Sequence, residues 1–164
     1  MATKFTEVYD RFFDKITDDM YLELTELDTK KDCQSLLINA IPKFEFPKKP
    51  LTYELMKNDD EFSYEDDVSL FKEDLSLEEI NILASLMLEE WLQRQITSID
   101  NTRQKYYGSS FKLTSQAAHL NALMKLQEQI QTSNKKQQRL YGRRETGADG
   151  AIRSRWSVFN TYGN

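Results

Sequence analysis

One segment of the sequence constrains the fold more than any other: a long amphipathic helix that begins near residue 76. Ser76 and Glu79 have the spacing of a capping box, in which each side chain satisfies a free backbone amide at the helix start. Behind them, apolar residues recur every three or four positions over roughly six turns, about 35 Å of helix. These residues are Ile80, Leu83, Ala84, Met87, Leu88, Trp91, Leu92, Ile96 and Ile99. The pattern predicts one long helix whose apolar face must be covered by other elements.

A second long helix is expected after a short linker that contains Gly108. Either Thr114 or Ser115 has the chemistry of its N-cap. The residues expected to face inward are Ala117, Ala118, Leu120, Leu123, Met124, Leu126 and Ile130. Because a short loop joins them, the two helices should pack antiparallel. The polar stretch from Gln131 to Gln138 has little to bury by itself.

Shorter elements are expected before the long helices. An apolar helix face is formed by Phe5, Val8, Tyr9, Phe12, Phe13 and Ile16. Met20 to Leu27 alternates as a strand does, but the segment fits a helix as well, and both interpretations stay open. Thr29 and Asp32 resemble a capping box, with Asp in place of Glu, for a short helix that Pro42 ends.

The segment 42–75 is the irregular part of the chain. It holds all three prolines and an acidic stretch made of Asp59, Asp60, Glu61, Glu65, Asp66, Asp67, Glu73 and Asp74. Short extended pieces at Lys43–Phe46 and Phe62–Tyr64 are expected to pair as a small sheet. A solvated loop, contact with a basic partner and a hard-cation site all remain open for the acids, although the order of a calcium loop is absent.

The expected fold class is mainly α: a helical bundle with two long antiparallel helices, a small irregular or extended middle segment and an extended C-terminal arm. A chain of 164 residues suits one domain and can bury a core without staples. We expect a helical body over residues 1–141, with 42–75 as an acidic insertion, and an arm over residues 142–164.

Charge divides the chain unevenly. Residues 135–164 carry seven bases and two acids, which leaves the first 134 residues at −10 within a total of −5. There is no apolar run of about 18 residues to span a membrane, and the N-terminus lacks the order of a signal peptide. A single cysteine indicates a reducing compartment.

The sequence offers little chemistry of the catalytic kind. His119 and Cys33 are the only residues of their types, too few for a His/Cys zinc site. We expect Cys33 in the first turn of its helix, where a thiolate is favoured, although a buried thiol is the plainer interpretation, and we expect His119 to pack or lie at the surface. Phosphate-binding glycine motifs are absent. We therefore expect no enzyme, no cofactor and no metal.

The basic, aromatic C-terminus is the most informative feature for function. Trp, Tyr, Phe and Arg are the residues that anchor protein interfaces. The expected partner-binding residues are Arg143, Arg144, Ile152, Arg153, Arg155, Trp156, Val158, Phe159 and Tyr162. The alternatives are nucleic-acid binding by charge and stacking, or a solvated tail.

The order of these parts resembles a known family. The capped helix LSLEEINILASLMLEEWLQRQI, the segment GSSFKLTSQAAHLNALMKLQEQ and the ending IRSRWSVF are similar to the head-to-tail connector proteins of tailed bacteriophages, also called adaptor or neck proteins. The resemblance covers roughly residues 70–164 and includes no invariant motif.

The resemblance implies a structural role in the virion neck, assembled in the host cytoplasm. It implies a homo-oligomeric ring of about twelve copies that continues the portal channel. The C-terminal arm would dock on the portal protein, and the opposite face would receive the next neck or tail protein. An acidic body would let DNA pass without sequence-specific binding. The alternatives are a nucleic-acid-binding helical protein that uses the basic C-terminus, a small carboxylate enzyme, and another virion completion protein for head closure or tail completion.

Overall fold

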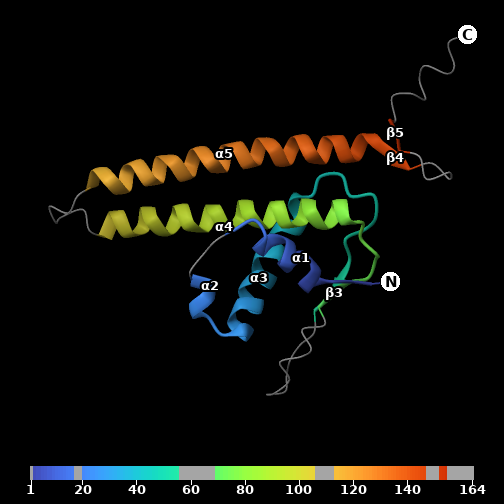
Figure 1. Ribbon diagram of the computed structural model, residues 1–164, viewed down its shortest axis with the longest axis horizontal. Helices are drawn as coiled ribbons and strands as arrows, with labels where there is room; N and C mark the ends of the chain where they lie inside the picture. The colour runs from blue at the N-terminus through green and yellow to red at the C-terminus, as the bar shows by residue number, and fades with distance from the viewer. Residues whose placement is uncertain (1, 17–19, 56–68, 106–112, 147–151, 155–164) are drawn as a thin grey trace, which may run out of the picture.

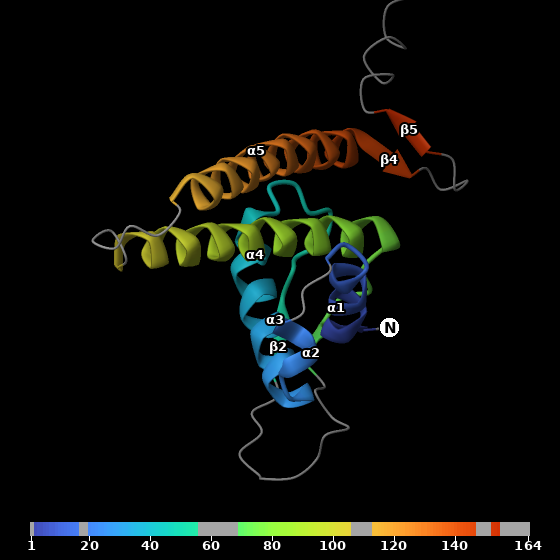
Figure 2. The ribbon, with the colours of Figure 1, turned by 60° about the vertical axis from the view of Figure 1, so that its left-hand side comes forward.

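Helix α4, spanning Leu77–Lys105, is the axis of the molecule, and α5, spanning Leu113–Arg143, runs antiparallel along one side of it (Figure 1). The computed structural model describes residues 2–16, 20–55, 69–105, 113–146 and 152–154. The expected class is confirmed: the protein is mainly helical, and its two long helices pack against each other. The shorter elements cover α4 on the side away from α5 (Figure 2).

The start of α4 follows its predicted capping box. The Ser76 amide donates to Glu79 Oε2 at 2.7 Å, and the Glu79 amide donates to Ser76 Oγ at 3.3 Å. Of the predicted apolar face, Ile80, Leu83, Ala84, Met87 and Leu92 are buried, while Leu88, Trp91, Ile96 and Ile99 are partly buried. Ile82 and Leu86 are buried as well, which the single predicted face did not include. They follow Glu79 at spacings of three and seven, on the side of α4 that meets α5.

Helix α1, spanning Phe5–Phe13, packs on α4 through the face predicted from the sequence. Phe5, Val8, Tyr9 and Phe12 are buried, and Phe13 and Ile16 are partly buried against the same core. The segment with two open interpretations forms a short helix, α2, at Met20–Glu23. A turn around Thr25 connects α2 to α3.

Helix α3, spanning Glu26–Ala40, begins earlier than predicted. Thr25 is its N-cap, since the Asp28 amide donates to Thr25 Oγ1 at 3.2 Å. The predicted cap at Thr29 is therefore wrong, and Thr29 lies inside the helix. After Ala40 the chain tightens into the 3-10 turn η1, Ile41–Lys43, with Pro42 in its first turn.

A three-stranded antiparallel sheet in the order β1-β3-β2 lies beside α1. Strand β3, Leu70–Phe71, pairs with β1, Thr3–Lys4, and with β2, Tyr53–Glu54. The sheet predicted from Lys43–Phe46 and Phe62–Tyr64 is wrong in its first member, because Lys43 ends the 3-10 turn and the actual strands lie elsewhere; residues 62–64 lie outside the described residues. The Phe5 ring packs 4.8 Å from that of Phe71 and 5.7 Å from that of Tyr53, measured between centroids.

Helix α5 departs most from its prediction. It starts at Leu113, so Thr114 and Ser115 are helical residues and neither is its N-cap. Among the residues expected to face inward, only Leu120 is buried, and Leu123 and Ile130 are partly buried. Ala118 is exposed, as are Met124 at 52% and Leu126 at 43%, and the side chain of Ala117 lies outside the described part. The polar half instead buries Asn134, Gln138 and Tyr141.

At the end of α5 the chain forms an antiparallel pair, β4 at Arg144–Thr146 and β5 at Ile152–Ser154. Two segments of the predicted arm therefore pair with each other as a hairpin that continues from the last turn of α5 (Figure 1). The residues between them and those from 155 onward lie outside the described part of the chain.

Candidate interaction surfaces

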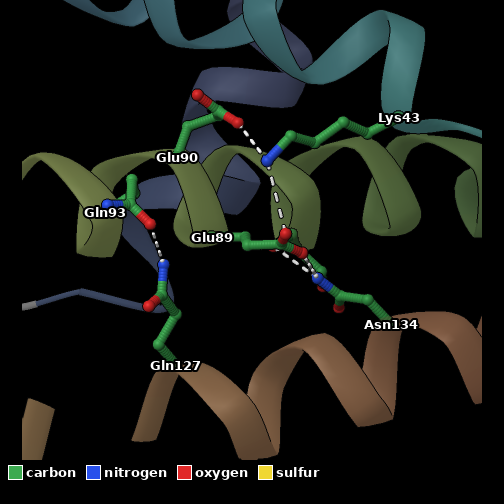
Figure 3. Close-up of polar contacts among 7 residues, drawn as sticks. Lys43, Glu89, Glu90, Gln93, Gln127 and Asn134 are labelled. Atoms are coloured by element: carbon green, nitrogen blue, oxygen red, sulfur yellow. Dashed lines mark hydrogen bonds and ion pairs between the residues drawn. The ribbon is translucent and has the colours of Figure 1, made fainter. Parts of the chain in front are cut away.

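The contact between α4 and α5 is polar along much of its length (Figure 3). Asn134 Nδ2 donates to the Ser85 carbonyl and to Glu89 Oε2, each at 3.1 Å. About two turns away along α5, Gln127 Nε2 donates to Gln93 Oε1 at 2.7 Å. Along the contact, amide and carboxylate side chains thus occupy positions three or four residues apart, where two packed helices usually place apolar residues. We call this row of contacts between α4 and α5 the polar seam.

Lys43 joins this polar seam from the 3-10 turn. Its Nζ lies 3.3 Å from Glu89 Oε1 and also contacts the Glu90 carboxylate (Figure 3). Burial lowers the pKa of Lys43, but the two carboxylates more than offset that, and the net pKa is raised. Lys43 therefore stays charged and compensates Glu89, which is mostly buried where it meets Asn134.

The other end of the seam holds a buried carboxylate. Glu79 is 2% exposed and accepts hydrogen bonds from the Ser76 amide, the Ser76 hydroxyl and the Tyr141 hydroxyl. Burial and the bond to Glu79 raise the pKa of Tyr141 well above its usual value, so the phenol keeps its proton. The Glu79 oxygens are committed to the helix cap and to α5, which gives them a structural role.

The segment after η1 crosses the C-terminal end of α5. Gln138 Oε1 accepts the Glu45 amide at 2.7 Å, and Lys48 Nζ lies 4.3 Å from the centroid of the Tyr141 ring. A Cβ added to Gly142 would lie 3.1 Å from the Phe46 Cβ, so glycine lets this segment pass close to the helix. These contacts fix the end of α5 from which the C-terminal hairpin starts.

Cys33 is a buried thiol near the middle of α3, because that helix starts at residue 26. Burial, followed by the neighbouring Asp32 carboxylate, raises its pKa to about 12. The expected thiolate position is therefore wrong. His119 is exposed on α5, and α4 separates α3 from α5, so the two residues form no dyad (Figure 2).

Asp32 connects three helices. It accepts the Tyr21 hydroxyl at 2.7 Å and contacts the Arg94 guanidinium, which joins α2, α3 and α4. Burial and the bond to Asp32 raise the pKa of Tyr21 above its usual value. Beside this cluster, a cavity of about 370 Å³ opens between α1, α2 and α3. Its wall includes Tyr9, Phe13, Tyr21 and Leu24, and its acids are Asp10 and Glu26.

The structure reaches only part of the predicted docking arm. Arg143 ends α5, and Arg144 Nη1 lies 3.0 Å from Glu78 Oε1, so the base of the arm is bound to the start of α4. In the hairpin, Arg153 is opposite Glu145 and Ile152 is opposite Thr146. The predicted anchors Arg155, Trp156, Val158, Phe159 and Tyr162 lie outside the described residues. The acidic stretch is likewise described only at Glu73 and Asp74.

A surface that the sequence analysis did not single out lies on the outer side of α5. Its cations are Lys125, Lys135, Lys136, Arg139 and Arg143, all exposed, and Glu128 is the only acid of this helix. With the exposed Leu126 and Leu140 they form what we call the basic face. The sequence signal for it is the run of bases after residue 134, for which the sequence analysis predicted no helix surface.

Comparison with known proteins gives no further guidance: no family model, curated protein or solved structure matches this chain. In the described part of the chain, no helix is long and apolar enough to cross a membrane. Within the same residues, no three His, Cys, Asp or Glu side chains gather as metal ligands.

Proposed function

We propose that this chain is a structural ring subunit of the neck of a tailed bacteriophage, a head-to-tail connector that joins the portal vertex to the tail and continues the DNA channel. In this proposal the C-terminal arm, residues 142–164, docks on the portal protein. The observation that carries it is the way the arm begins. Helix α5 runs along the whole of α4 and passes at Arg143 directly into the β4–β5 hairpin, whose first residue is held by Glu78.

The polar contacts along α4 and α5 support this role. An arm that docks on a partner needs a fixed base, because ordering each residue of a free segment costs about 1–2 kcal/mol. Asn134, Gln138 and Tyr141 each bond to a specific partner outside α5, so the helix cannot slide along α4 without breaking these bonds. The start of the arm is thereby placed at one end of the body.

The test removes residues 145–164 and keeps Arg144 with its bond to Glu78. The truncated chain should keep its helical circular dichroism and its urea midpoint, and should lose binding to the portal ring of the same virion. A full-length Trp156→Ala/Phe159→Ala variant is the matched control against gross truncation effects, and should bind at least tenfold more weakly, since aromatic anchors dominate interfaces. Normal attachment of the truncated chain would contradict the docking role.

The basic face favours one second candidate, a nucleic-acid-binding helical protein. Five exposed cations on one helix are a footprint for phosphates. This candidate requires that the isolated chain bind duplex DNA with an affinity that falls steeply as salt rises. The −10 charge of the first 134 residues opposes such binding. An isolated chain that does not bind DNA at 50 mM salt would eliminate it.

A further inference from the structure

Exposed leucines lie on opposite sides of α4, three of them close together at one corner and two of them about 21 Å apart along α5. At the corner between α2 and α3, Leu22 is 84% exposed, Leu24 36% and Leu27 39%. On the outer side of α5, Leu126 and Leu140 are each 43% exposed. Figures 1 and 2 both place α4 between α5 and this corner. Single exposed leucines are ordinary, but three within six residues of sequence indicate a surface that binds another apolar surface.

The two leucine groups have charges of opposite sign beside them. Leu140 lies one helical turn from Lys136 and Arg143 on the basic face. The leucines of the corner lie near the exposed carboxylates of Asp10 and Glu23, neither of which pairs with a cation among the described residues. Two bases, Lys30 and Lys31, are also present at this corner. The Lys30 ammonium lies 2.8 Å from Glu26 Oε1 and offsets that charge, so Lys31 is the base that opposes the charges of Asp10 and Glu23. We call this surface, with Leu22, Leu24, Leu27, Asp10 and Glu23, the corner face.

The cavity beside the corner face has the chemistry to accept a cationic side chain. Its wall combines the rings of Tyr9, Phe13 and Tyr21 with the carboxylate of Asp10. The Glu26 carboxylate in the same wall is bound by Lys30, which also lines the cavity, so Asp10 is the acid that an incoming cation would meet. Arg and Lys bind aromatic faces and carboxylates together, through cation–π attraction and charge-assisted hydrogen bonds. At about 370 Å³ the hollow is large enough for one such side chain.

We propose that the corner face of one copy of this chain binds the basic face of a second copy, with an Arg or Lys of α5 entering the cavity between α1, α2 and α3. Because the two faces differ and lie on opposite sides of the molecule, each copy can bind one neighbour at each face. Such a head-to-tail contact repeats, and it closes into a ring when the rotation between copies allows. The inference rests on the proposed function, for which it supplies the contact between neighbouring subunits.

The leucines decide between a second copy and nucleic acid as the occupant of the basic face. Phosphates would pair with the cations, but would leave Leu126 and Leu140 against a charged backbone. A protein surface with leucines and carboxylates satisfies both kinds of side chain, and the corner face has both. The basic face and the corner face are therefore complementary both in their exposed leucines and in the sign of their charges.

Charge reversal in the full chain tests the contact. Sedimentation at low salt should show self-association that weakens as salt rises. Asp10→Lys/Glu23→Lys should weaken it at least tenfold, and so should Lys136→Glu/Arg139→Glu, because each replaces attraction by repulsion. Placing all four substitutions in one chain should restore association to within about threefold of the original, since the reversed faces are again complementary. Circular dichroism of each variant verifies folding.

Disulfide trapping gives a second measurement that does not depend on charge. In a Cys33→Ala background, a chain with Leu24→Cys mixed with a chain with Leu140→Cys should form a mixed disulfide under mild oxidation. Each chain alone should form little homodimer, because a head-to-tail contact places unlike faces together. Equal cross-linking in all three samples would contradict a specific contact.

Other outcomes would overturn the inference outright. One is a chain that stays monomeric at low salt up to a protein concentration of about 1 mM and forms no mixed disulfide. Another is self-association that neither pair of charge reversals weakens. A third is DNA binding that Lys136→Glu/Arg139→Glu abolishes, in a chain that does not self-associate. Binding to portal rings distinguishes this contact from the proposed function. If the chain binds portal rings and its self-association does not respond to the charge reversals, only this contact is refuted. If the chain self-associates through both faces but does not bind portal rings, only the neck role is refuted.

Discussion

The two sides of α4 are built from different chemistry. On one side, α1 and α3 bury Phe12, Leu36 and Met87 in an apolar core. On the other, where Ile82 and Leu86 are buried as well, α5 also meets α4 through the polar pairs Glu79–Tyr141, Asn134–Glu89 and Gln127–Gln93. Apolar burial is non-directional and gives most of the stabilisation, whereas hydrogen bonds between specific partners are satisfied in only one register. The comparison teaches that α4 packs on α1 and α3 through apolar burial, whereas on its α5 side specific hydrogen bonds are added that set the position of α5.

The apolar side should show the largest response. Phe12→Ala removes a fully buried ring and should lower the free energy of unfolding by about 3–5 kcal/mol. Leu126→Ala, on the exposed side of α5, is the matched control and should change it by less than about 0.5 kcal/mol. Urea denaturation followed by circular dichroism measures both. Equal losses would mean that Phe12 does not contribute the apolar burial described for this side.

The buried Glu79–Tyr141 pair should show the next largest effect. Glu79→Ala leaves the Tyr141 hydroxyl and the Ser76 amide without their acceptor, and should cost about 1–3 kcal/mol. In a double-mutant cycle, Tyr141→Phe should cost much less in the Glu79→Ala background than in the original chain. Strict additivity of the two substitutions would show that the pair does not couple α4 to α5.

The apolar side should also respond to alkaline pH. The Cys33 thiol ionises near 9 when unfolded, and burial raises its pKa to about 12 in the fold. The folded state then holds a proton that the unfolded state releases, so stability is complete below pH 9 and falls as pH rises above it, by up to about 1.4 kcal/mol per pH unit. Urea midpoints at pH 8 and 10 should fall further for the original chain than for Cys33→Ala. Parallel changes in both would contradict a buried thiol.

The smallest effect on stability, and the sharpest test of register, comes from Asn134→Leu. A leucine removes two hydrogen bonds but adds apolar area, so the net change in unfolding free energy should stay within about 1 kcal/mol. The position of α5 on α4 should become less unique. Cysteine pairs placed in register and one turn out of register, at exposed sites of the two helices, would show cross-linking of the second pair only in the leucine variant.

Local signals predicted α1 and the start of α4 because the same residues decide both the element and its packing. Ser76 and Glu79 bond to each other within one helical turn, so their cap needs no distant partner. The apolar face of α1 is buried whichever element covers it. The signal for the start of α3 was misleading. Thr25 with Asp28 has the same spacing as the predicted Thr29 with Asp32, and the helix starts at Thr25, while Asp32 is bound by Tyr21 and Arg94.

For the candidate interaction surfaces, the sequence located the basic C-terminal region but not its surface. It treated the cations after residue 134 as one basic region and assigned partner binding to the arm, whereas Lys135, Lys136 and Arg139 lie exposed on α5. The corner face brings together α1, α2 and the start of α3, and no spacing within one element could indicate that cavity. The residues from Arg155 onward remain a prediction from composition.

The sequence by itself determined that the chain is mainly helical, where α4 begins, which face of α1 is buried, and that charge separates the C-terminal region from the rest. These properties follow from spacing and capping within one segment. Only the tertiary structure decided that a polar half of α5 would be buried, and that Cys33 would be a protonated thiol. The physical reason is that a polar group can be buried at little cost only where a distant segment supplies its hydrogen-bond partner, and the location of that partner is a property of the fold.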